Sequence, residues 1–286
     1  MLRLAAHQYP DDALLIMAIV NRTPDSFYDR GATYAFDKAF DRVTEVVAAG
    51  AEIVDIGGVK AAPGDEVDAA EEIRRTVAFV AKVRAEFPDL VISVDTWRHE
   101  VGRAVCQAGA DLLNDAWGGH DRQLAEVAAE FDAALVCTHA GGAQPRTRPH
   151  RIFYDDVVAD VLAVTTGLAE RAVAAGVDRA RLMIDPGHDF GKNTWHSLEL
   201  TRRLSELVAT GWPVLVSLSN KDFVGEALDL PLEQRLLGTL SATALCAWQG
   251  ATVFRAHNVA ETRQVLDMVA AVRGSSPPKR AVRGLA

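Results

Sequence analysis

The chain has 286 residues, of which 49% are hydrophobic and 24% charged, a composition typical of a soluble globular protein rather than a disordered or fibrous one. Its net charge of −9 would repel polyanions, so we expect no nucleic-acid partner. The longest apolar run, residues 13–20, is far shorter than the ~20 residues that cross a membrane, and no secretory signal is evident. We therefore expect a cytoplasmic protein without a membrane partner.

Short apolar runs rich in β-branched residues recur along the chain, and each ends on a polar residue or a glycine. They predict strands over residues 14–21, 52–58, 91–96, 112–118, 134–139, 182–187, 214–219 and 252–258. The segments between them show helical spacing of apolar residues. One helical pattern starts at Phe36 and ends before Gly50, and another follows Pro231.

Successive strands start about 20 to 50 residues apart, which leaves room for a crossover helix and makes neighbouring strands parallel. Eight such units predict a single-domain α/β protein with the (β/α)8 TIM-barrel fold. An open doubly wound sheet is the alternative, but no G-x-G-x-x-G motif follows any strand. We expect the barrel over residues 1–272 and a basic, flexible C-terminal tail over residues 273–286.

The three cysteines, Cys106, Cys137 and Cys246, are widely spaced along the sequence. This spacing offers neither a disulfide framework nor a metal-binding knuckle. We therefore expect three buried free thiols.

Polar residues stand at the carboxyl ends of the predicted strands, the edge at which barrel active sites lie. In chain order they are Asn21, Asp55, Asp95, Asn114 with Asp115, His139, Asp185, Ser219 with Lys221, and Arg255 with His257. Any single one of them could be a helix cap or a salt-bridged group. Because all of these sets meet on one rim, we expect several of them to bind a ligand.

Several segments resemble dihydropteroate synthase, the folate-biosynthesis enzyme that joins a dihydropterin pyrophosphate to p-aminobenzoate. The segment Asn21-Arg22-Thr23-Pro24-Asp25-Ser26-Phe27 is similar to the first-loop signature of that family. Similar pieces follow in family order: Asp55-Ile56-Gly57-Gly58, Ser93-Val94-Asp95-Thr96, Leu113-Asn114-Asp115, Asp185-Pro186-Gly187, Phe190-Gly191-Lys192, Ser219 with Lys221, Phe223-Val224-Gly225 and Arg255-Ala256-His257. The resemblance spans nearly the whole chain and implies a (β/α)8 barrel that forms a homodimer.

The resemblance also implies a pterin pocket. The amino-pyrimidinone edge of a pterin offers two parallel N–H donors, and a carboxylate can accept both in a forked pair. By resemblance Asp185 supplies that fork, and Asp95 and Asn114 complete the polar match around the ring. Lys221 would meet the carbonyl and ring-nitrogen side.

Arg255 and His257 alternate along one strand, so both side chains point to the same face. They resemble the family pair that binds the pyrophosphate of the pterin substrate, and Asn21 resembles the residue that helps hold its Mg²⁺, a cation that keeps most of its waters. Lys221, Arg255 and His257 are the catalytic residues that the resemblance implies. Their expected task is electrostatic: to stabilise the leaving charge and the electron-poor pterin.

Four segments depart from the family pattern. The second-loop signature Gly-Gly-Glu-Ser-Thr-Arg-Pro-Gly is replaced by Gly57-Gly58-Val59-Lys60-Ala61-Ala62-Pro63-Gly64, which removes a threonine and an arginine that help bind pyrophosphate and shape the p-aminobenzoate site. The seventh-strand signature Ser-Arg-Lys-Ser is replaced by Ser219-Asn220-Lys221-Asp222, whose added carboxylate opposes a benzoate. Tyr28-Asp29-Arg30 stands in place of Ser-Asp-Gly, and His188-Asp189 in place of an apolar-Gly pair.

This pattern predicts a divergent, impaired or inactive paralogue, a pterin-binding protein with weak or absent dihydropteroate synthesis. Its ligand would be a small pterin, with pyrophosphate or p-aminobenzoate analogues as further candidates. An active synthase is one alternative, because Arg30 or Lys60 could replace the lost loop groups. The others are a non-catalytic regulatory barrel, a methyl-folate-dependent methyltransferase and, remotely, a Schiff-base aldolase that uses Lys221.

Overall fold

The computed structural model describes residues 1–23, 35–61, 63–147 and 152–284. Four of the sequence features above lie outside the described residues: most of the first-loop signature, the segment Tyr28-Asp29-Arg30, the second-loop residue Ala62, and the last two residues of the tail.

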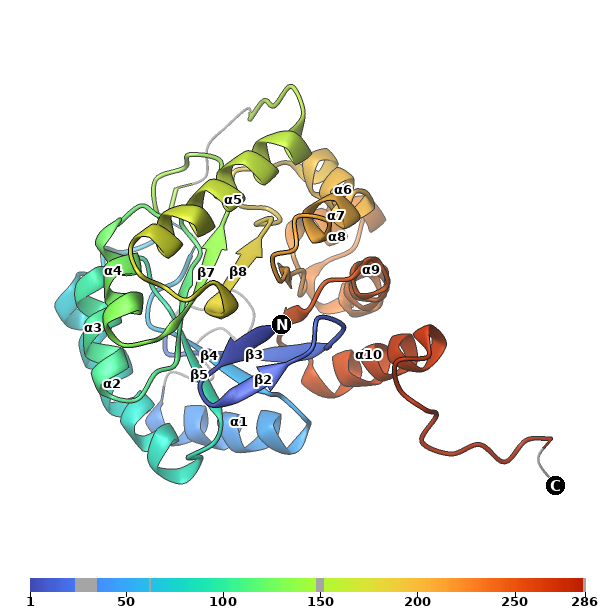
Figure 1. Cartoon of the computed structure of the whole chain (residues 1–286), viewed down its shortest axis with the longest axis horizontal. Coiled ribbons are helices and arrows are strands. Elements are labelled where there is room, and N and C mark those ends of the chain that lie inside the picture. Colours follow the sequence, from blue (N-terminus) through green and yellow to red (C-terminus); the bar gives the residue numbers. More distant parts are fainter. Residues whose placement is uncertain (24–34, 62, 148–151, 285–286) are drawn as a thin grey trace.

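Within the described residues, eight parallel strands form one closed barrel (Figure 1). Their hydrogen-bonded order is β8-β7-β6-β5-β4-β3-β10-β9, and a parallel bridge between Ile184 and Val214 closes the ring. The strands are β3 (Leu15–Asn21), β4 (Ile53–Gly57), β5 (Val91–Asp95), β6 (Leu112–Asp115), β7 (Ala134–Thr138), β8 (Leu182–Asp185), β9 (Leu215–Ser217) and β10 (Val253–Ala256). Each lies within a predicted run, so the predicted (β/α)8 fold is confirmed.

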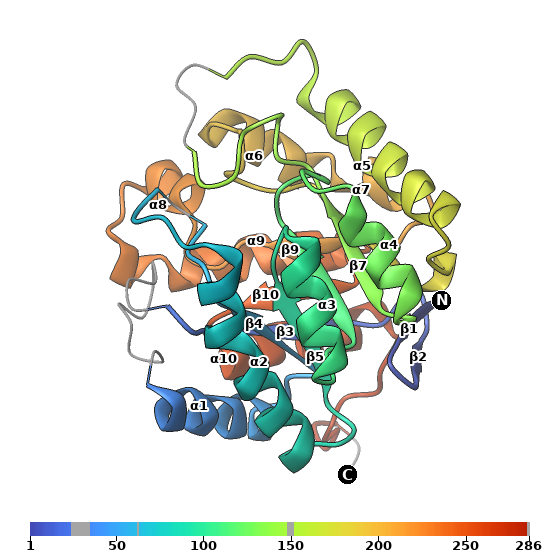
Figure 2. The same cartoon turned by 90° about the vertical axis from the view of Figure 1, so that its left-hand side faces the viewer.

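Helices surround the barrel on its outer side (Figure 2). They are α1 (Phe36–Ala48), α2 (Ala69–Glu86), α3 (His99–Gln107), α4 (Gln123–Glu130), α5 (Val157–Ala174), α6 (Thr194–Arg202), α7 (Leu204–Val208), α8 (Asp222–Leu228), α9 (Leu236–Gln249) and α10 (Val259–Arg273). Helix α1 illustrates the sequence rule: Ala39, Val43 and Val46 recur at helical spacing and are buried. Gly50 then takes a left-handed φ of 95°, which turns the chain toward β4.

The first residues form an antiparallel hairpin that the sequence patterns did not predict, with β1 (Leu2–Leu4) paired to β2 (His7–Tyr9). The hairpin lies in front of the barrel strands in Figure 1. Leu2 and Leu4 are buried in one apolar cluster with interior residues such as Met17 and Met183. The hairpin therefore covers the amino-terminal end of the barrel, and a ligand has to enter at the opposite end.

The barrel interior changes from apolar to polar along the strands. One buried apolar cluster contains Ile53, Val91, Leu112, Met183 and Val253. Two residues further along the same strands stand Asp55, Ser93, Asn114, Asp185 and Arg255. Because side chains on a strand alternate between its two faces, these polar groups point into the same interior. The alternation therefore collects them at the open end.

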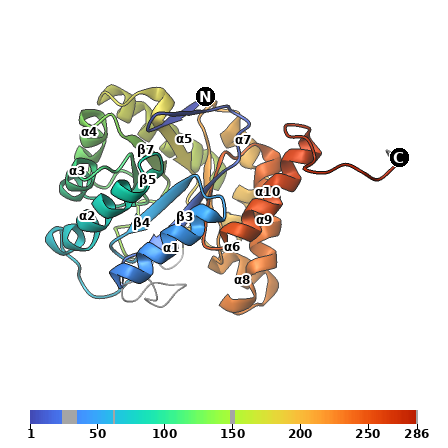
Figure 3. The ribbon, with the colours of Figure 1, turned by 90° about the horizontal axis from the view of Figure 1, so that it is seen from below.

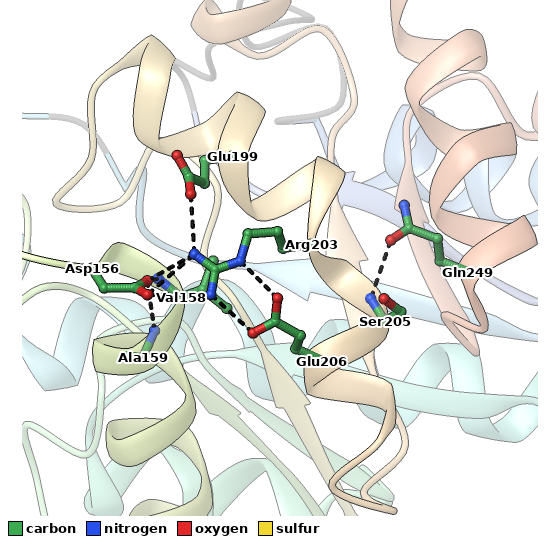
Figure 4. A network of polar contacts seen from close by, with 8 residues as sticks. All are labelled: Asp156, Val158, Ala159, Glu199, Arg203, Ser205, Glu206 and Gln249. Atoms are coloured by element: carbon green, nitrogen blue, oxygen red, sulfur yellow. Dashed lines mark hydrogen bonds and ion pairs between the residues drawn. The ribbon is translucent and has the colours of Figure 1, made fainter.

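Arg203 ties the helices beside β8 together (Figure 4). Its guanidinium donates to Glu206 at 2.7 Å, to Glu199 at 3.0 Å and to Asp156 at 3.1 Å. Asp156 also caps α5, since it accepts the backbone N–H of Val158 at 2.8 Å. This network joins the start of α5 to α6 and α7, and it fixes the outer wall behind β7 and β8.

Beyond α10, residues 274–284 form no helix or strand and lead away from the body (Figure 3). Lys279 pairs with Asp267 of α10 at 2.5 Å. All three cysteines are free and buried, as predicted. Among the described residues no helix is both long and apolar enough to cross a membrane.

Candidate active site

Arg255 is the centre of a polar network in the barrel mouth. Its Nε donates to Asp55 Oδ2 at 2.6 Å, and its Nη2 donates to Asp95 Oδ2 at 3.0 Å. Asp55 also accepts hydrogen bonds from Ser93 Oγ at 2.6 Å and from Asn114 Nδ2 at 3.1 Å. The predicted residues Asp95, Asn114 and Arg255 are thus joined in one network. Asp55, which sequence reasoning placed on the rim without a role, links them.

Burial makes Asp95 a weak acid. Desolvation raises its pKa to about 7, although Arg255 lowers it, and the neighbouring Asp55 carboxylate raises it further. Asp95 therefore changes protonation state near neutral pH. A carboxyl group of this kind can accept a hydrogen bond from a ligand N–H when it is ionised and donate one to a ring nitrogen when it is protonated.

Asp185 and Lys221 stand on the other side of the mouth. Asp185 Oδ1 accepts the backbone N–H of Gly187 at 2.7 Å, and desolvation raises its pKa while Lys221 lowers it. Lys221 lies at the start of α8, donates to the carbonyl of His188, and places its ammonium 4.9 Å from the centre of the Phe190 ring. Desolvation lowers the pKa of Lys221, while nearby carboxylates oppose the shift. The two predicted ligand groups, one acidic and one basic, therefore lie close enough to influence each other's pKa.

His257 is a neutral group in this site. Its Nδ1 lies 2.9 Å from Ser219 Oγ, and Ser219 Oγ accepts the backbone N–H of His257 at 3.1 Å. Desolvation, together with the charges of Arg255 and Arg42, lowers the pKa of His257 to about 3. At physiological pH the imidazole therefore brings hydrogen bonds to an anion but no positive charge.

Asn21 ends β3 beside the backbone of β4, where its register partner is Gly57. A Cβ atom on residue 57 would lie 3.3 Å from Asn21 Oδ1. Because Gly57 has no side chain, the amide of Asn21 has space at the open end of the barrel.

Asp115 and His139, two of the polar residues at strand ends, contact loop residues. Asp115 accepts the backbone N–H groups of Trp117 at 2.9 Å and Gly119 at 2.8 Å. His139 Nε2 lies 2.7 Å from Asp160 Oδ2, and its Nδ1 lies 2.7 Å from Lys192 Nζ. These contacts hold the loops in place, and their strand-end position alone did not distinguish them from ligand groups.

Lys192 is a buried residue whose role was not predicted. Its ammonium donates to the carbonyls of Gly187 at 3.0 Å, Phe190 at 2.9 Å and His139 at 3.1 Å. Burial lowers its pKa to about 7. Lys192 thus holds the loop after β8 against the loop after β7. The loop after β8 is the one that follows Asp185 and carries Phe190.

Asp189 is another positioning residue. It replaces a family glycine and adopts a left-handed φ of 66°. Its Oδ2 accepts the backbone N–H groups of Asp222 at 2.7 Å and Phe223 at 3.3 Å, at the start of α8. The new carboxylate of Asp222 accepts from Arg235 at 2.9 Å. Asp189 after β8 and Asp222 after β9, both of which differ from the family pattern, are therefore hydrogen-bonded to each other next to Lys221.

A cavity of about 380 Å³ opens at the loop after β8, and neither Asp185 nor the network of Arg255 lines it. Its apolar wall includes Trp117, Phe190 and Phe223, and the rings of Trp117 and Phe190 meet edge to face at 5.2 Å. Lys221 also lines the cavity. Ala61, at the position of the lost family threonine, is part of its wall. The cavity has the size and lining of a small-molecule site.

Comparison with known proteins gives three close similarities besides a family match. The family described as "Pterin binding enzyme" matches residues 17–257. The "Inactive dihydropteroate synthase 2" of Mycobacterium leprae is 59% identical over 279 residues, which are 96% of each chain. The dihydropteroate synthase of Haemophilus influenzae is 38% identical over 252 residues, 88% of this chain and 91% of the relative. The structure of Yersinia pestis dihydropteroate synthase with a sulfonamide drug complex has a TM-score of 0.90 at 35% identity, and covers 96% of this chain and 99% of that one.

Proposed function

The chain belongs to the pterin-binding enzyme family as a dihydropteroate synthase homologue, and from this membership we propose that it binds a pterin in the barrel mouth while its synthesis of dihydropteroate is weak or absent. The observation that carries the proposal is the buried network of Arg255, Asp95 and Asn114, which faces Asp185 and Lys221 across the open end. The resemblance to dihydropteroate synthase that the motifs indicated is confirmed by the comparisons.

The chemistry of these groups suits a nitrogen-rich bicycle. When ionised, Asp185 can accept two parallel N–H donors, and Lys221 can donate to a carbonyl or ring nitrogen. Asp95, with a pKa of about 7, can donate or accept at the ring. Phe190 forms a flat apolar surface beside Lys221. A pterin presents this combination of donors, acceptors and an aromatic face.

Within the described part of the chain, the pyrophosphate leaving group meets little positive charge that is not already paired. Arg255 already contacts two carboxylates, Asp55 and Asp95, and His257 is neutral. Ala61 brings no hydroxyl to the cavity wall. Loss of one partner of a desolvated charge contact costs about 2 to 5 kcal/mol, so the departure of pyrophosphate would be strongly slowed. We assign weak catalysis to this shortage of positive charge.

The donor set also allows the Mg²⁺ that the family resemblance implies. Asn21 Oδ1 is an uncharged oxygen at the open end, and a mostly hydrated Mg²⁺ needs few protein ligands. When bound there, the cation would neutralise charge on the pyrophosphate. We propose that Asn21 is its protein ligand. Titration of pyrophosphate with and without Mg²⁺ tests this, since Asn21→Ala should remove the Mg²⁺-dependent gain in affinity.

The apolar outer face of α9 and α10 supports a homodimer. Leu237, Leu245 and Trp248 on α9 are more than half exposed, as are Met268 and Val272 on α10. The two helices pack against each other in Figure 3. An apolar face of this kind is typical of a protein interface. We propose that a second copy of the chain covers it, and light scattering should show a dimer that Trp248→Glu dissociates; a monomeric wild type would contradict this.

We also propose that the protein is cytoplasmic. All three cysteines are free thiols, and free thiols without disulfides are typical of a reducing compartment. Fractionation of the source cells tests the location directly.

Calorimetry with 6-hydroxymethylpterin tests pterin binding. Wild type should bind one pterin per chain, and Asp185→Asn should weaken binding at least about 30-fold because a charged fork becomes a neutral amide. Asp111→Asn is the matched control: it makes the same change in a carboxylate that pairs with Arg84 at the start of β6, at the opposite end of the barrel. Binding that Asp185→Asn leaves unchanged would remove the pocket assignment.

A further inference from the structure

Thr138, the last residue of β7, carries a buried hydroxyl that the proposed function does not yet use. The residue is 2% exposed, and its Oγ1 has no hydrogen-bond partner among the described residues. Buried polar groups in folded proteins are almost always hydrogen-bonded, and each exception calls for an explanation such as a functional role or a bound water or ion. The orphaned hydroxyl therefore indicates a partner that binds from outside the chain.

The strand register places Thr138 beside the proposed pterin fork. Its register partner on β8 is Asp185. Two residues earlier on the same strands, Val136 and Met183 are register partners and both belong to the apolar cluster of the barrel interior. Because strands alternate with period two, Thr138 and Asp185 also point into the barrel, at its open end.

The surroundings of Thr138 leave its hydroxyl unpaired. A Cβ atom on residue 187 would lie 3.2 Å from Thr138 Cγ2, so the methyl group packs toward the backbone of Gly187. Asp185 Oδ1 is already hydrogen-bonded to the N–H of that glycine. Two serine hydroxyls of neighbouring strands are paired: Ser93 Oγ donates to Asp55, and Ser219 Oγ lies 2.9 Å from His257 Nδ1. Thr138 differs from both.

We propose that Thr138 is a further ligand-contacting residue, whose hydroxyl hydrogen-bonds to the polar edge of the nitrogen heterocycle that Asp185 holds. The inference rests on the proposed function and names one more determinant of the same site. A hydroxyl can donate to a ring carbonyl or nitrogen and can accept an amino hydrogen. Thr138 would therefore favour amino-pyrimidinone rings over ring analogues that lack a polar atom beside the fork, because the hydroxyl would then stay buried and unpaired.

Calorimetric titration with 6-hydroxymethylpterin tests this contact in three variants. Thr138→Val keeps the shape and removes the hydroxyl, and should weaken binding about 3- to 10-fold, the effect of one neutral hydrogen bond. Thr138→Ser keeps the hydroxyl and should bind within about twofold of wild type. Thr165→Val is the control, since that buried hydroxyl donates to the carbonyl of Val161 on α5, away from the mouth. Its pterin affinity should be unchanged.

The thermal midpoint of the ligand-free variants gives a second readout. Thr138→Val should melt no lower than wild type because its hydroxyl has no partner to lose, whereas Thr165→Val should melt lower. If Thr138→Val binds pterin as tightly as wild type while Asp185→Asn loses binding, this inference falls and the proposed function stands. If wild type binds no pterin, both fall. A lower ligand-free midpoint for Thr138→Val, equal to that of Thr165→Val, would show an internal partner and overturn the inference.

Discussion

The strongest electrostatic prediction concerns the change Arg255→Met. The guanidinium contacts two carboxylates, the buried Asp55 at 2.6 Å and the partly buried Asp95 at 3.0 Å. Removing one member of a buried ion pair costs about 3 to 5 kcal/mol because the remaining charge has no compensation. In the variant, Asp55 still accepts hydrogen bonds from Ser93 and Asn114. When Asp95 is protonated, we therefore expect the loss in the free energy of unfolding to lie near the lower end of this range.

The loss should grow with pH, and the pKa of Asp95 sets its size. In wild type this carboxyl has a raised pKa of about 7, so its stability contribution declines as pH rises from the unfolded value toward 7 and is constant above it. Without Arg255 the pKa rises further, and the variant goes on losing stability above pH 7. Each pH unit is worth about 1.4 kcal/mol. We expect a loss of about 3 kcal/mol at pH 6 and a loss larger by about 1 kcal/mol at pH 8.

Urea unfolding of Arg255→Met and wild type at pH 6 and pH 8 measures both values. Arg103→Met is the control, because Arg103 pairs with Glu130 on the surface, where both side chains are about half exposed, and its loss should be small and equal at the two pH values. A destabilisation by Arg255→Met that is the same at both pH values, or smaller at pH 8, would refute this account of the buried network.

Three further predictions test other parts of the structure. Leu4→Ala should lower the free energy of unfolding by about 2 to 5 kcal/mol in urea while leaving pterin affinity unchanged, because the hairpin covers the far end of the barrel; weakened binding would contradict this. Asp189→Ala should cost about 1 kcal/mol and speed amide hydrogen exchange at Asp222 and Phe223, since their shared acceptor is lost; unchanged exchange would show that another group caps α8. The three thiols should resist a disulfide reagent at pH 8 until the protein is unfolded, because burial raises the pKa of each to about 12, and fast labelling of the folded protein would contradict their burial.

Sequence patterns predicted the barrel because each of its strands lies in a short apolar run that ends on a polar residue or a glycine. The hairpin of β1 and β2 gave no such signal, because its strands have three residues each and are too short to show a period. Leu2 and Leu4 are buried by contact with the barrel interior, which the sequence alone does not show. The period of two also predicted that polar strand ends would meet, as Asp95, Asn114 and Arg255 do.

The roles within that group depended on contacts between strands that are far apart in the chain. Asp55 and Arg255 are 200 residues apart, so sequence alone did not show that the carboxylate holds the arginine. The neutral state of His257 likewise follows from its burial and from the nearby arginines, which lower its pKa. Asp222 was expected to repel a benzoate, yet its carboxylate pairs with Arg235, which partly offsets that repulsion. Residue types predicted the chemistry of the site, and packing decided the protonation and pairing.

Dihydropteroate formation under pterin saturation tests the central claim most directly. The protein would be incubated with dihydropterin pyrophosphate, p-aminobenzoate and Mg²⁺, at a pterin concentration that calorimetry shows to be saturating, beside the Haemophilus influenzae synthase as a positive control. We predict bound pterin and product formation far below the ~1 to 1,000 per second of ordinary enzymes. Turnover within that range would show that the mouth supplies enough positive charge for the leaving pyrophosphate, and would contradict the proposed function.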